Sequence, residues 1–336
     1  MDIQRILIIR FSSIGDIVLT TPVIRAIKTH QPGIEVHYLT QEGFSPILDN
    51  NPYLDKVIIY KSLIRTSLEL KRQRYDVILD LHNNFRSRII TLLVAAEIIR
   101  YKKLNIEKWL MVNFKINRLP NIHVVDRYME TLVPLNIKSD QLGLDYFIPE
   151  KDIVETDWIP ETHRNGYIVY GIGAQHGTKK LPFEKMIELC AKINKPIILV
   201  GDTLDVEVGE KIKDFFTSDV SDSLDSVLKK MHKQTVIFNA AGKFNLNQTA
   251  SIIKKAEFVF THDTSIMHIA AAFKKRIFSI WGNTIPLFGM YPYKTKFWIF
   301  ENKDLECRPC SKIGFNKCPK GHFNCMNGLS FDFYLE

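Results

Sequence analysis

Short apolar runs alternate with longer amphipathic stretches along the whole chain. The runs are rich in Ile, Val and Leu, as in parallel strands that are buried on both faces. Expected strands are 5–11, 34–40, 56–60, 76–81, 166–171, 196–200 and 258–260, and the segments 236–239, 246–255 and 276–281 complete the second set. Expected helices are 17–28, 44–50, 62–74, 123–135, 182–193, 205–216 and 266–273, and 80–87 ends a strand and begins a further helix. This alternation predicts an α/β architecture built on parallel sheets.

The alternation breaks at 149–165, where Pro, Glu, Asp and Thr occur with little periodicity. Such a stretch is typical of a domain linker. We therefore expect two Rossmann-like, doubly wound domains that face each other across a cleft. The boundaries are 1–155 for an N-terminal domain, 166–300 for a C-terminal domain and 301–336 for a cysteine-containing tail. The aromatic-rich run 285–293 is expected to form a loop over the cleft.

The first expected strand is followed by the loop Ser12-Ser-Ile-Gly-Asp16. A strand, a short loop and a helix open a doubly wound sheet, and ligands bind at the strand ends. With one glycine, the loop does not match the dinucleotide fingerprint. Asp16 could be a helix cap or a carboxylate that faces a ligand, and the helix dipole should lower its pKa.

A second strand-to-helix junction lies at 257–273. Asp263, Thr264 and Ser265 stand between the strand and the helix. The free N–H groups at a helix start bind anions such as phosphate without a metal ion. His268 shares a helix face with Thr264, because the two are four residues apart. The alternative is a capped helix whose His268 packs against the next strand.

Composition restricts the partners of the chain. It has 46% hydrophobic and 24% charged residues, a formal charge of +8 and a pI near 9.1. An anionic substrate or an anionic membrane surface fits this excess better than nucleic acid, since the sequence has no arginine-rich tract and no aromatic RNA-binding signature. We expect no membrane span, and charged residues interrupt the first twenty positions, unlike a signal peptide. A cytoplasmic protein is therefore expected.

Four of the five cysteines lie near the end of the sequence, at Cys307, Cys310, Cys318 and Cys325. An odd number of cysteines in a cytoplasmic protein favours reduced, structural thiols over disulfides. The first pair has the Cys-x2-Cys spacing of zinc sites, whereas six residues separate the second pair. A structural zinc ion is thus an alternative to free thiols.

Taken together, these segments resemble the heptosyltransferases of glycosyltransferase family 9, which have the two-domain GT-B fold. The resemblance covers nearly the whole chain and depends on 10–16, 80–87, 179–182, 261–272 and the cysteine-rich tail. It implies an inverting, metal-independent enzyme that moves heptose from ADP-heptose to the lipid-linked inner core of lipopolysaccharide, with no cofactor. The enzyme would be cytoplasmic and peripherally associated with the inner membrane. The alternative is a related transferase that uses another nucleotide sugar for a cell-surface glycan.

The resemblance also implies roles for particular residues. Asp16 stands where the family has its proposed catalytic base, and Asn84 and Arg86 lie in the stretch that resembles its acceptor motif. The expected donor-binding residues are Ser13, Gly15, Thr178, Lys179, Asp205, Asp263, Thr264, Ser265 and His268, and no metal ligand is expected. Ser265 replaces the usual glycine, and Leu181 stands where the family often has Trp. Residue by residue, a solvated loop charge at Lys179, a helix cap at Asp205 and a polar helix face at Arg86 remain alternatives.

Overall fold

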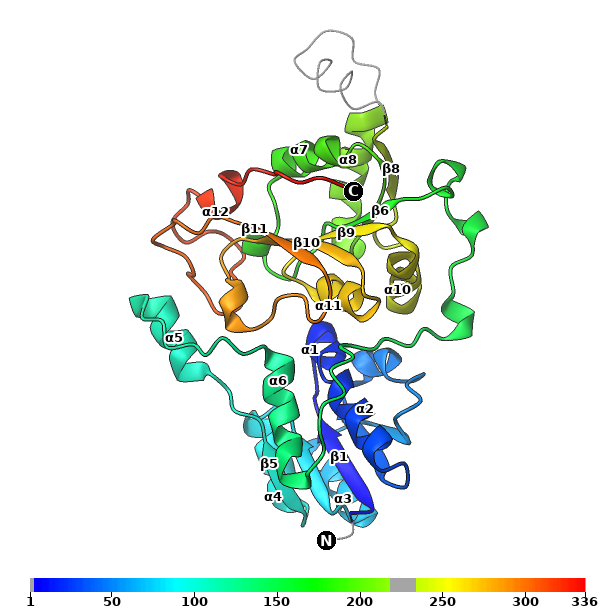
Figure 1. Ribbon diagram of the computed structural model, residues 1–336, viewed down its shortest axis with the longest axis vertical. Coiled ribbons are helices and arrows are strands. Elements are labelled where there is room, and N and C mark those ends of the chain that lie inside the picture. Colours follow the sequence, from blue (N-terminus) through cyan, green and yellow to red (C-terminus); the bar gives the residue numbers. More distant parts are fainter. Residues whose placement is uncertain (1–2, 218–233, 336) are drawn as a thin grey trace. The chain divides into compact units, whose positions relative to one another are not determined.

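The computed structural model describes residues 3–217 and 234–335 (Figure 1). The chain divides into two compact units, residues 1–105 with 120–149 and residues 106–119 with 150–336. Each unit holds a parallel α/β sheet, as the apolar pattern predicts. The grouping of 106–119 with the second unit has no counterpart in the sequence pattern. Among the described helices, none combines the length and apolar character that crossing a bilayer requires.

The first unit contains a parallel sheet with the strand order β3-β2-β1-β4-β5. Its strands are β1 (Arg5–Ile9), β2 (Glu35–Thr40), β3 (Lys56–Ile59), β4 (Val77–Asp80) and β5 (Glu97–Arg100). Leu7, Ile9 and Ile78 lie in its core without solvent contact. In the register, Ile9 pairs with Leu39 and Asp80, so the loops after β1 and β4 leave the same edge of the sheet. That edge is where ligands bind in doubly wound sheets.

The helices of the first unit are α1 (Ile14–Val18), α2 (Thr21–His30), α3 (Leu63–Gln73), α4 (Phe85–Leu93) and α6 (Val124–Met129), with 3₁₀ turns at Glu42–Ile47 and Glu130–Leu135. The single helix expected at 17–28 is instead two helices. Pro22 has no N–H to donate, and the hydroxyls of Thr20 and Thr21 donate to the carbonyls of Ile17 and Val18 at 2.7 and 2.8 Å. These bonds end α1 before α2 begins.

The second unit contains a parallel sheet with the order β11-β10-β9-β6-β7-β8. Its strands are β6 (Ile168–Gly171), β7 (Pro196–Val200), β8 (Val236–Asn239), β9 (Phe258–His262), β10 (Arg276–Trp281) and β11 (Phe297–Glu301). Its helices are α5 (Asn105–Phe114), α7 (Phe183–Ile193), α8 (Val206–Thr217), α10 (Leu246–Lys255), α11 (Ser265–Ala272) and α12 (Asn324–Asn327). The strand β11 and the helix α5 were not expected from the sequence. The segment 246–255, expected to help complete the second sheet, is instead the helix α10, whose start is capped by Asn245 Oδ1 accepting from the Gln248 amide at 2.9 Å.

The expected linker is attached to the second unit. Asp152 accepts hydrogen bonds from the side chains of Asn245 and Asn247 at 2.9 and 3.1 Å, and the amide of Val154 donates to Ser251 Oγ at 2.9 Å. Residues 150–163 also form three short 3₁₀ turns. This polar stretch therefore forms hydrogen bonds with α10 and with the residue that caps it.

The C-terminal tail belongs to the hydrophobic core of the second unit. Met326 and Phe331 have no exposed surface, and the ring of Phe331 meets that of Phe300 edge-on at 5.3 Å. The tail thus covers an apolar region that the strands β10 and β11 would otherwise expose to water.

Replacing Phe331 with alanine is expected to lower the free energy of unfolding by about 3–5 kcal/mol, because a buried aromatic ring leaves a cavity that relaxes only in part. Urea unfolding followed by circular dichroism measures this change. The control is Tyr334→Ala, since that side chain is 82% exposed and should change stability by no more than about 0.5 kcal/mol. Equal effects of the two changes would show that the tail is not part of the core.

Candidate active site

Arg10 and Asp16 form an ion pair at the edge of the first sheet where ligands are expected. The Arg10 Nη2 and Asp16 Oδ2 atoms lie 2.6 Å apart. The same guanidinium donates to the carbonyls of Ser12 and Leu81 at 2.7 and 2.8 Å and to the hydroxyl of Tyr128 at 3.1 Å. With its donors divided among four partners from three segments of the chain, Arg10 is held in one position. It therefore fixes one oxygen of the Asp16 carboxylate.

The Asp16 carboxylate is ionised at neutral pH. Burial would raise its pKa, but the charge of Arg10 and the hydrogen bonds from Ser13 outweigh this effect and lower the pKa below its usual value. The Ser13 hydroxyl donates to Asp16 Oδ2 at 3.0 Å. Because 23% of the Asp16 side chain stays exposed, a substrate hydroxyl can reach it. The group can accept a proton, although its low pKa makes it a weak base before the reaction begins.

Replacing Arg10 with glutamine is expected to raise the pKa of Asp16, because the carboxylate loses its main positive neighbour. The acidic limb of the pH profile of kcat/KM should then move to higher pH. Arg10→Lys keeps a positive charge and should leave the limb nearer its original position. An unchanged acidic limb in the glutamine variant, with folding confirmed by circular dichroism, would show that the pair does not control the titration that limits activity.

The predicted acceptor residues lie at the start of α4, which leaves the same sheet edge as α1, the helix that carries Asp16. The guanidinium of Arg86 lies 5.1 Å from the centre of the Tyr60 ring and 5.7 Å from that of Phe11. Such stacking places the charge over the sheet edge instead of on the far side of the helix. Asn84 caps α4, since its Oδ1 accepts from the Ser87 amide at 2.8 Å. Its role toward an acceptor stays a prediction.

His82 lies beside the same loop and is neutral at pH 7. Burial and the nearby charge of Arg10 lower its pKa to about 3. Its ring meets that of Phe11 edge-on at 5.1 Å, and within the described part of the chain its buried Nδ1 atom has no hydrogen-bond partner. His82 therefore adds a neutral, polar ring to an edge that otherwise carries charges.

In the second unit, Lys179 lies against the start of α11. Its Nζ atom lies 2.6 Å from Asp263 Oδ2 and 3.1 Å from the Asp263 carbonyl. Asp263 Oδ2 also accepts from the Thr284 hydroxyl at 2.9 Å. The Thr264 hydroxyl is bonded to that of Thr261 at 3.2 Å and does not cap the helix. An ammonium group and the first N–H groups of a helix thus lie together, which favours an anion there.

The neighbouring residue, Lys180, has a different partner. Its Nζ atom lies 2.6 Å from Oδ1 of the buried Asp205, whose Oδ2 accepts from the Asp202 amide at 3.1 Å. Cβ atoms at Gly173 and Gly201 would approach Asp205 Oδ2 to 2.2 and 2.7 Å. The Asp205 carboxylate therefore fits only because residues 173 and 201 are glycines. It connects the loops after β6 and β7 through its contacts with Lys180 and Asp202. This structural role agrees with the cap alternative, and the donor contact stays a prediction.

Two further residues fix the loop that carries Lys179. The Thr178 hydroxyl donates to the carbonyl of Phe315 and accepts from its amide, at 3.1 and 2.8 Å. His262 Nε2 accepts from the Leu181 amide at 3.1 Å, and burial lowers the pKa of His262 to about 4. A neutral imidazole can accept this bond, whereas an imidazolium could not. His268, one turn into α11, is buried.

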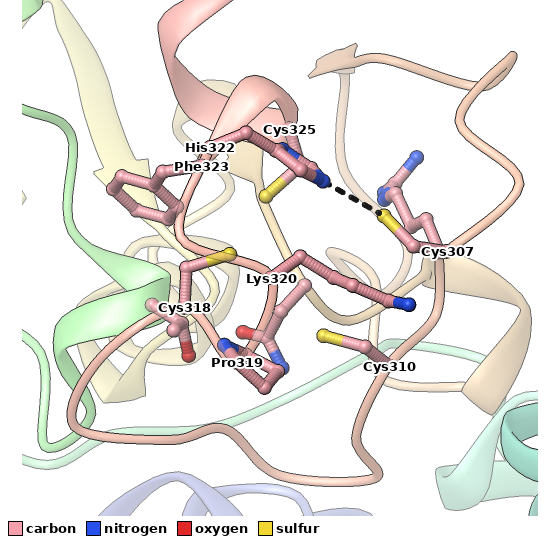
Figure 2. Close-up of a pocket in the computed structure, with 11 residues that line it drawn as sticks. Cys307, Cys310, Cys318, Pro319, Lys320, His322, Phe323 and Cys325 are labelled. Atoms are coloured by element: carbon pink, nitrogen blue, oxygen red, sulfur yellow. Dashed lines mark hydrogen bonds between the residues drawn. The ribbon is translucent and has the colours of Figure 1, made fainter.

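The four C-terminal cysteines line one pocket of the second unit together with Lys320 and His322 (Figure 2). All four thiols are free, and burial raises the pKa of Cys325 to about 12. The contact between Cys307 Sγ and His322 Nε2 measures 3.9 Å. Within residues 3–217 and 234–335, no three His, Cys, Asp or Glu side chains are placed to hold one metal ion. Free thiols stay the prediction, with a structural zinc ion as the alternative.

The structure groups the predicted residues into one cluster per unit. Ser13, Gly15 and Asp16 lie on or beside α1, with Asn84 and Arg86 at the start of α4. Lys179, Asp263, Thr264 and Ser265 meet at the start of α11. Sequence reasoning assigned no role to Arg10, His262 or Thr284, which hold these clusters. For Arg10 the signal in the sequence was its place at the start of the 10–16 motif, six positions before Asp16.

Comparison with known proteins identifies the family. The model of glycosyltransferase family 9 (heptosyltransferase) matches residues 63–317. The lipopolysaccharide heptosyltransferase 1 of Campylobacter coli is 26% identical over 301 residues, which cover 84% of each chain. Two solved structures share the fold. The family 9 glycosyl transferase of Veillonella parvula has a TM-score of 0.71 at 18% identity, over 91% of this chain and 89% of its own. The ADP-heptose lipopolysaccharide heptosyltransferase II of Escherichia coli has a TM-score of 0.68 at 19% identity, over 97% and 98%. The predicted GT-B class is confirmed, and because the family model matches well over half of the sequence, the chain belongs to glycosyltransferase family 9, the heptosyltransferases, and is a glycosyltransferase.

Proposed function

We propose that this enzyme transfers heptose from ADP-heptose to the inner core of lipopolysaccharide, with inversion at the anomeric carbon and without a metal ion. The observation that supports it most is the ionised Asp16 carboxylate, oriented by Arg10 in a chain of the heptosyltransferase family. The lipopolysaccharide acceptor is the one in the names of the relatives from Campylobacter coli and Escherichia coli.

In the proposed reaction, a hydroxyl oxygen of the acceptor attacks the anomeric carbon of the heptose. The bond from this carbon to the phosphate oxygen breaks, and its electron pair leaves with ADP. Asp16 takes the hydroxyl proton as the new bond forms. A single displacement of this kind inverts the configuration. Since the pKa of Asp16 is lowered, we expect the proton transfer late in the reaction. By then the new bond to the anomeric carbon has made the acceptor hydroxyl strongly acidic.

The departing diphosphate gains negative charge as the bond breaks. The ammonium group of Lys179 and the N–H groups at the start of α11 are the proposed stabilising groups. They supply the positive potential that a divalent cation provides in other enzymes, and this supports the metal-independent form of the proposal. Asp263 would hold Lys179 in place before the donor arrives, and domain closure would join the two clusters.

A lipid-linked acceptor requires the enzyme to work at a membrane surface. We therefore place it in the cytoplasm, peripherally associated with the inner membrane. The net charge of +8 supports this location, because anionic headgroups attract basic surfaces within about one Debye length.

A coupled assay of ADP release tests the proposal. Purified enzyme is supplied with a core-truncated lipopolysaccharide and with ADP-, UDP- or GDP-linked sugars in turn. We expect ADP release with ADP-heptose, dependent on the acceptor, and a product heavier by one heptose in mass spectrometry. Turnover with a different nucleotide sugar alone would favour the related-transferase alternative. Release of nucleotide without an acceptor would contradict a transferase mechanism.

A further inference from the structure

The helices α3 and α4 form one outward surface of the first unit. The chain passes from β3 to β4 through α3 and from β4 to β5 through α4, and both crossovers proceed in the same direction along the sheet. Right-handed crossovers then place the two helices on the same face, where they pack against each other. We call their outward side the α3–α4 face.

Large apolar side chains are exposed on the α3–α4 face. They are Ile64, Leu68, Phe85, Leu92 and Leu93, with exposed fractions of 70, 53, 82, 81 and 48%. On α3 the usual arrangement is partly inverted, because Thr66 and Ser67 are buried while Ile64 and Leu68 face solvent. Large exposed apolar side chains on two helices that pack against each other are typical of an interaction site.

The same face is strongly basic. The helices α3 and α4 together carry five arginine or lysine residues against Glu69, a net charge of +4 and half of the formal charge of the chain. All five basic residues, Arg65, Lys71, Arg72, Arg86 and Arg88, are exposed. The guanidinium of Arg86 also lies over the Phe11 and Tyr60 rings at the sheet edge. Glu69 is paired with Lys61 at 3.7 Å.

Exposed apolar side chains among basic residues match the interface of an anionic bilayer, where the apolar groups enter the headgroup region and the cations meet phosphates. A second copy of this chain fits less well, since a symmetric contact would bring two surfaces of charge +4 together. The helix α4, whose second residue is Arg86, also starts at the sheet edge that carries Asp16. A lipid surface on α4 would therefore lie near the site where a lipid-linked sugar must enter.

We propose that the α3–α4 face is the membrane-binding surface of the enzyme and that it binds anionic phospholipid headgroups. This inference rests on the proposed function for its lipid-linked acceptor.

Vesicle flotation tests it. Vesicles of phosphatidylcholine, pure or with about one third phosphatidylglycerol, are mixed with the full chain at low and high salt. We expect binding to the anionic vesicles that weakens with salt, and little binding to the neutral ones. The variant Ile64→Ser/Leu68→Ser should bind roughly tenfold or more weakly. Lys71→Gln/Arg72→Gln should also bind more weakly and tests the face if the serine variant does not fold.

Ile106→Ser on α5 is the matched control, because Ile106 is 71% exposed against 70% for Ile64. It should bind like the unmodified enzyme. The proposal would be overturned if the enzyme does not float with anionic vesicles or binds neutral vesicles equally well. It would also be overturned if the folded α3 variants bind like the unmodified enzyme, or if the control variant loses as much binding as they do. A dimer that the serine variant dissociates would assign the face to a second copy. All variants should keep full ADP release with a lipid-free core oligosaccharide, because this acceptor does not require membrane binding. If the unmodified enzyme releases no ADP in this assay, the result contradicts the proposed function and not the membrane-binding surface.

Discussion

Replacing Asp16 with asparagine is expected to lower kcat about a thousandfold, within the range of about 10² to 10⁴ that a positioned base contributes. Asparagine has a similar shape and can still accept a hydrogen bond from Arg10, but it cannot take the proton of the acceptor hydroxyl. The donor is held by the other unit in this proposal, so its apparent affinity should change little. Steady-state ADP release and isothermal titration with ADP measure the two quantities.

The control for this change is Ser13→Ala. It removes the hydroxyl that donates to Asp16 at 3.0 Å but keeps the carboxylate, so a loss of about ten- to a hundredfold is expected, the contribution of one hydrogen bond to a charged group and less than the loss in the asparagine variant. Thermal unfolding must accompany both variants, because the buried Arg10 loses its counterion in the asparagine variant. If the folded asparagine variant keeps kcat within tenfold, Asp16 is not the base and the mechanism needs another proton acceptor.

The apolar pattern predicted the two sheets because their strands are continuous runs of Ile, Val and Leu, and this signal does not depend on the rest of the chain. The apolar pattern did not predict the elements whose presence or ends depend on tertiary contacts. The strand β11 contains alternating side-chain exposure, and the helix α5 has no buried residue, so neither produces a clear buried run. The end of α1 depends on two threonine hydroxyls that bond to the preceding turn.

In the candidate site too, local motifs could be predicted from the sequence, whereas contacts between distant residues could not. The motif around Asp16 and the motif at 263–268 could be found from the sequence, because a strand, polar residues and a helix follow one another directly. The ion pair of Arg10 with Asp16 could not, since Tyr128, 118 residues away, helps to fix the guanidinium. The roles of Lys179 and Lys180 were also ambiguous in the sequence. The fold separates them, because each lysine pairs with an aspartate from a different loop.

Replacing Lys179 with alanine should therefore lower kcat by about 10² to 10³, the usual effect of removing one preorganised group that stabilises developing charge. Lys180→Ala is a closely matched control, because it also removes one lysine–aspartate contact of 2.6 Å from the same loop. If Lys179 acts on the leaving diphosphate, the control should lose less than about tenfold. Binding of ADP should weaken in the Lys179 variant and stay near its original value in the control, since only Lys179 lies beside the start of α11. Equal losses in both folded variants would mean that the lysines only hold the loop, and a larger loss at Lys180 would assign the diphosphate to Lys180. Both outcomes are measurable by ADP release and calorimetry on the same three proteins.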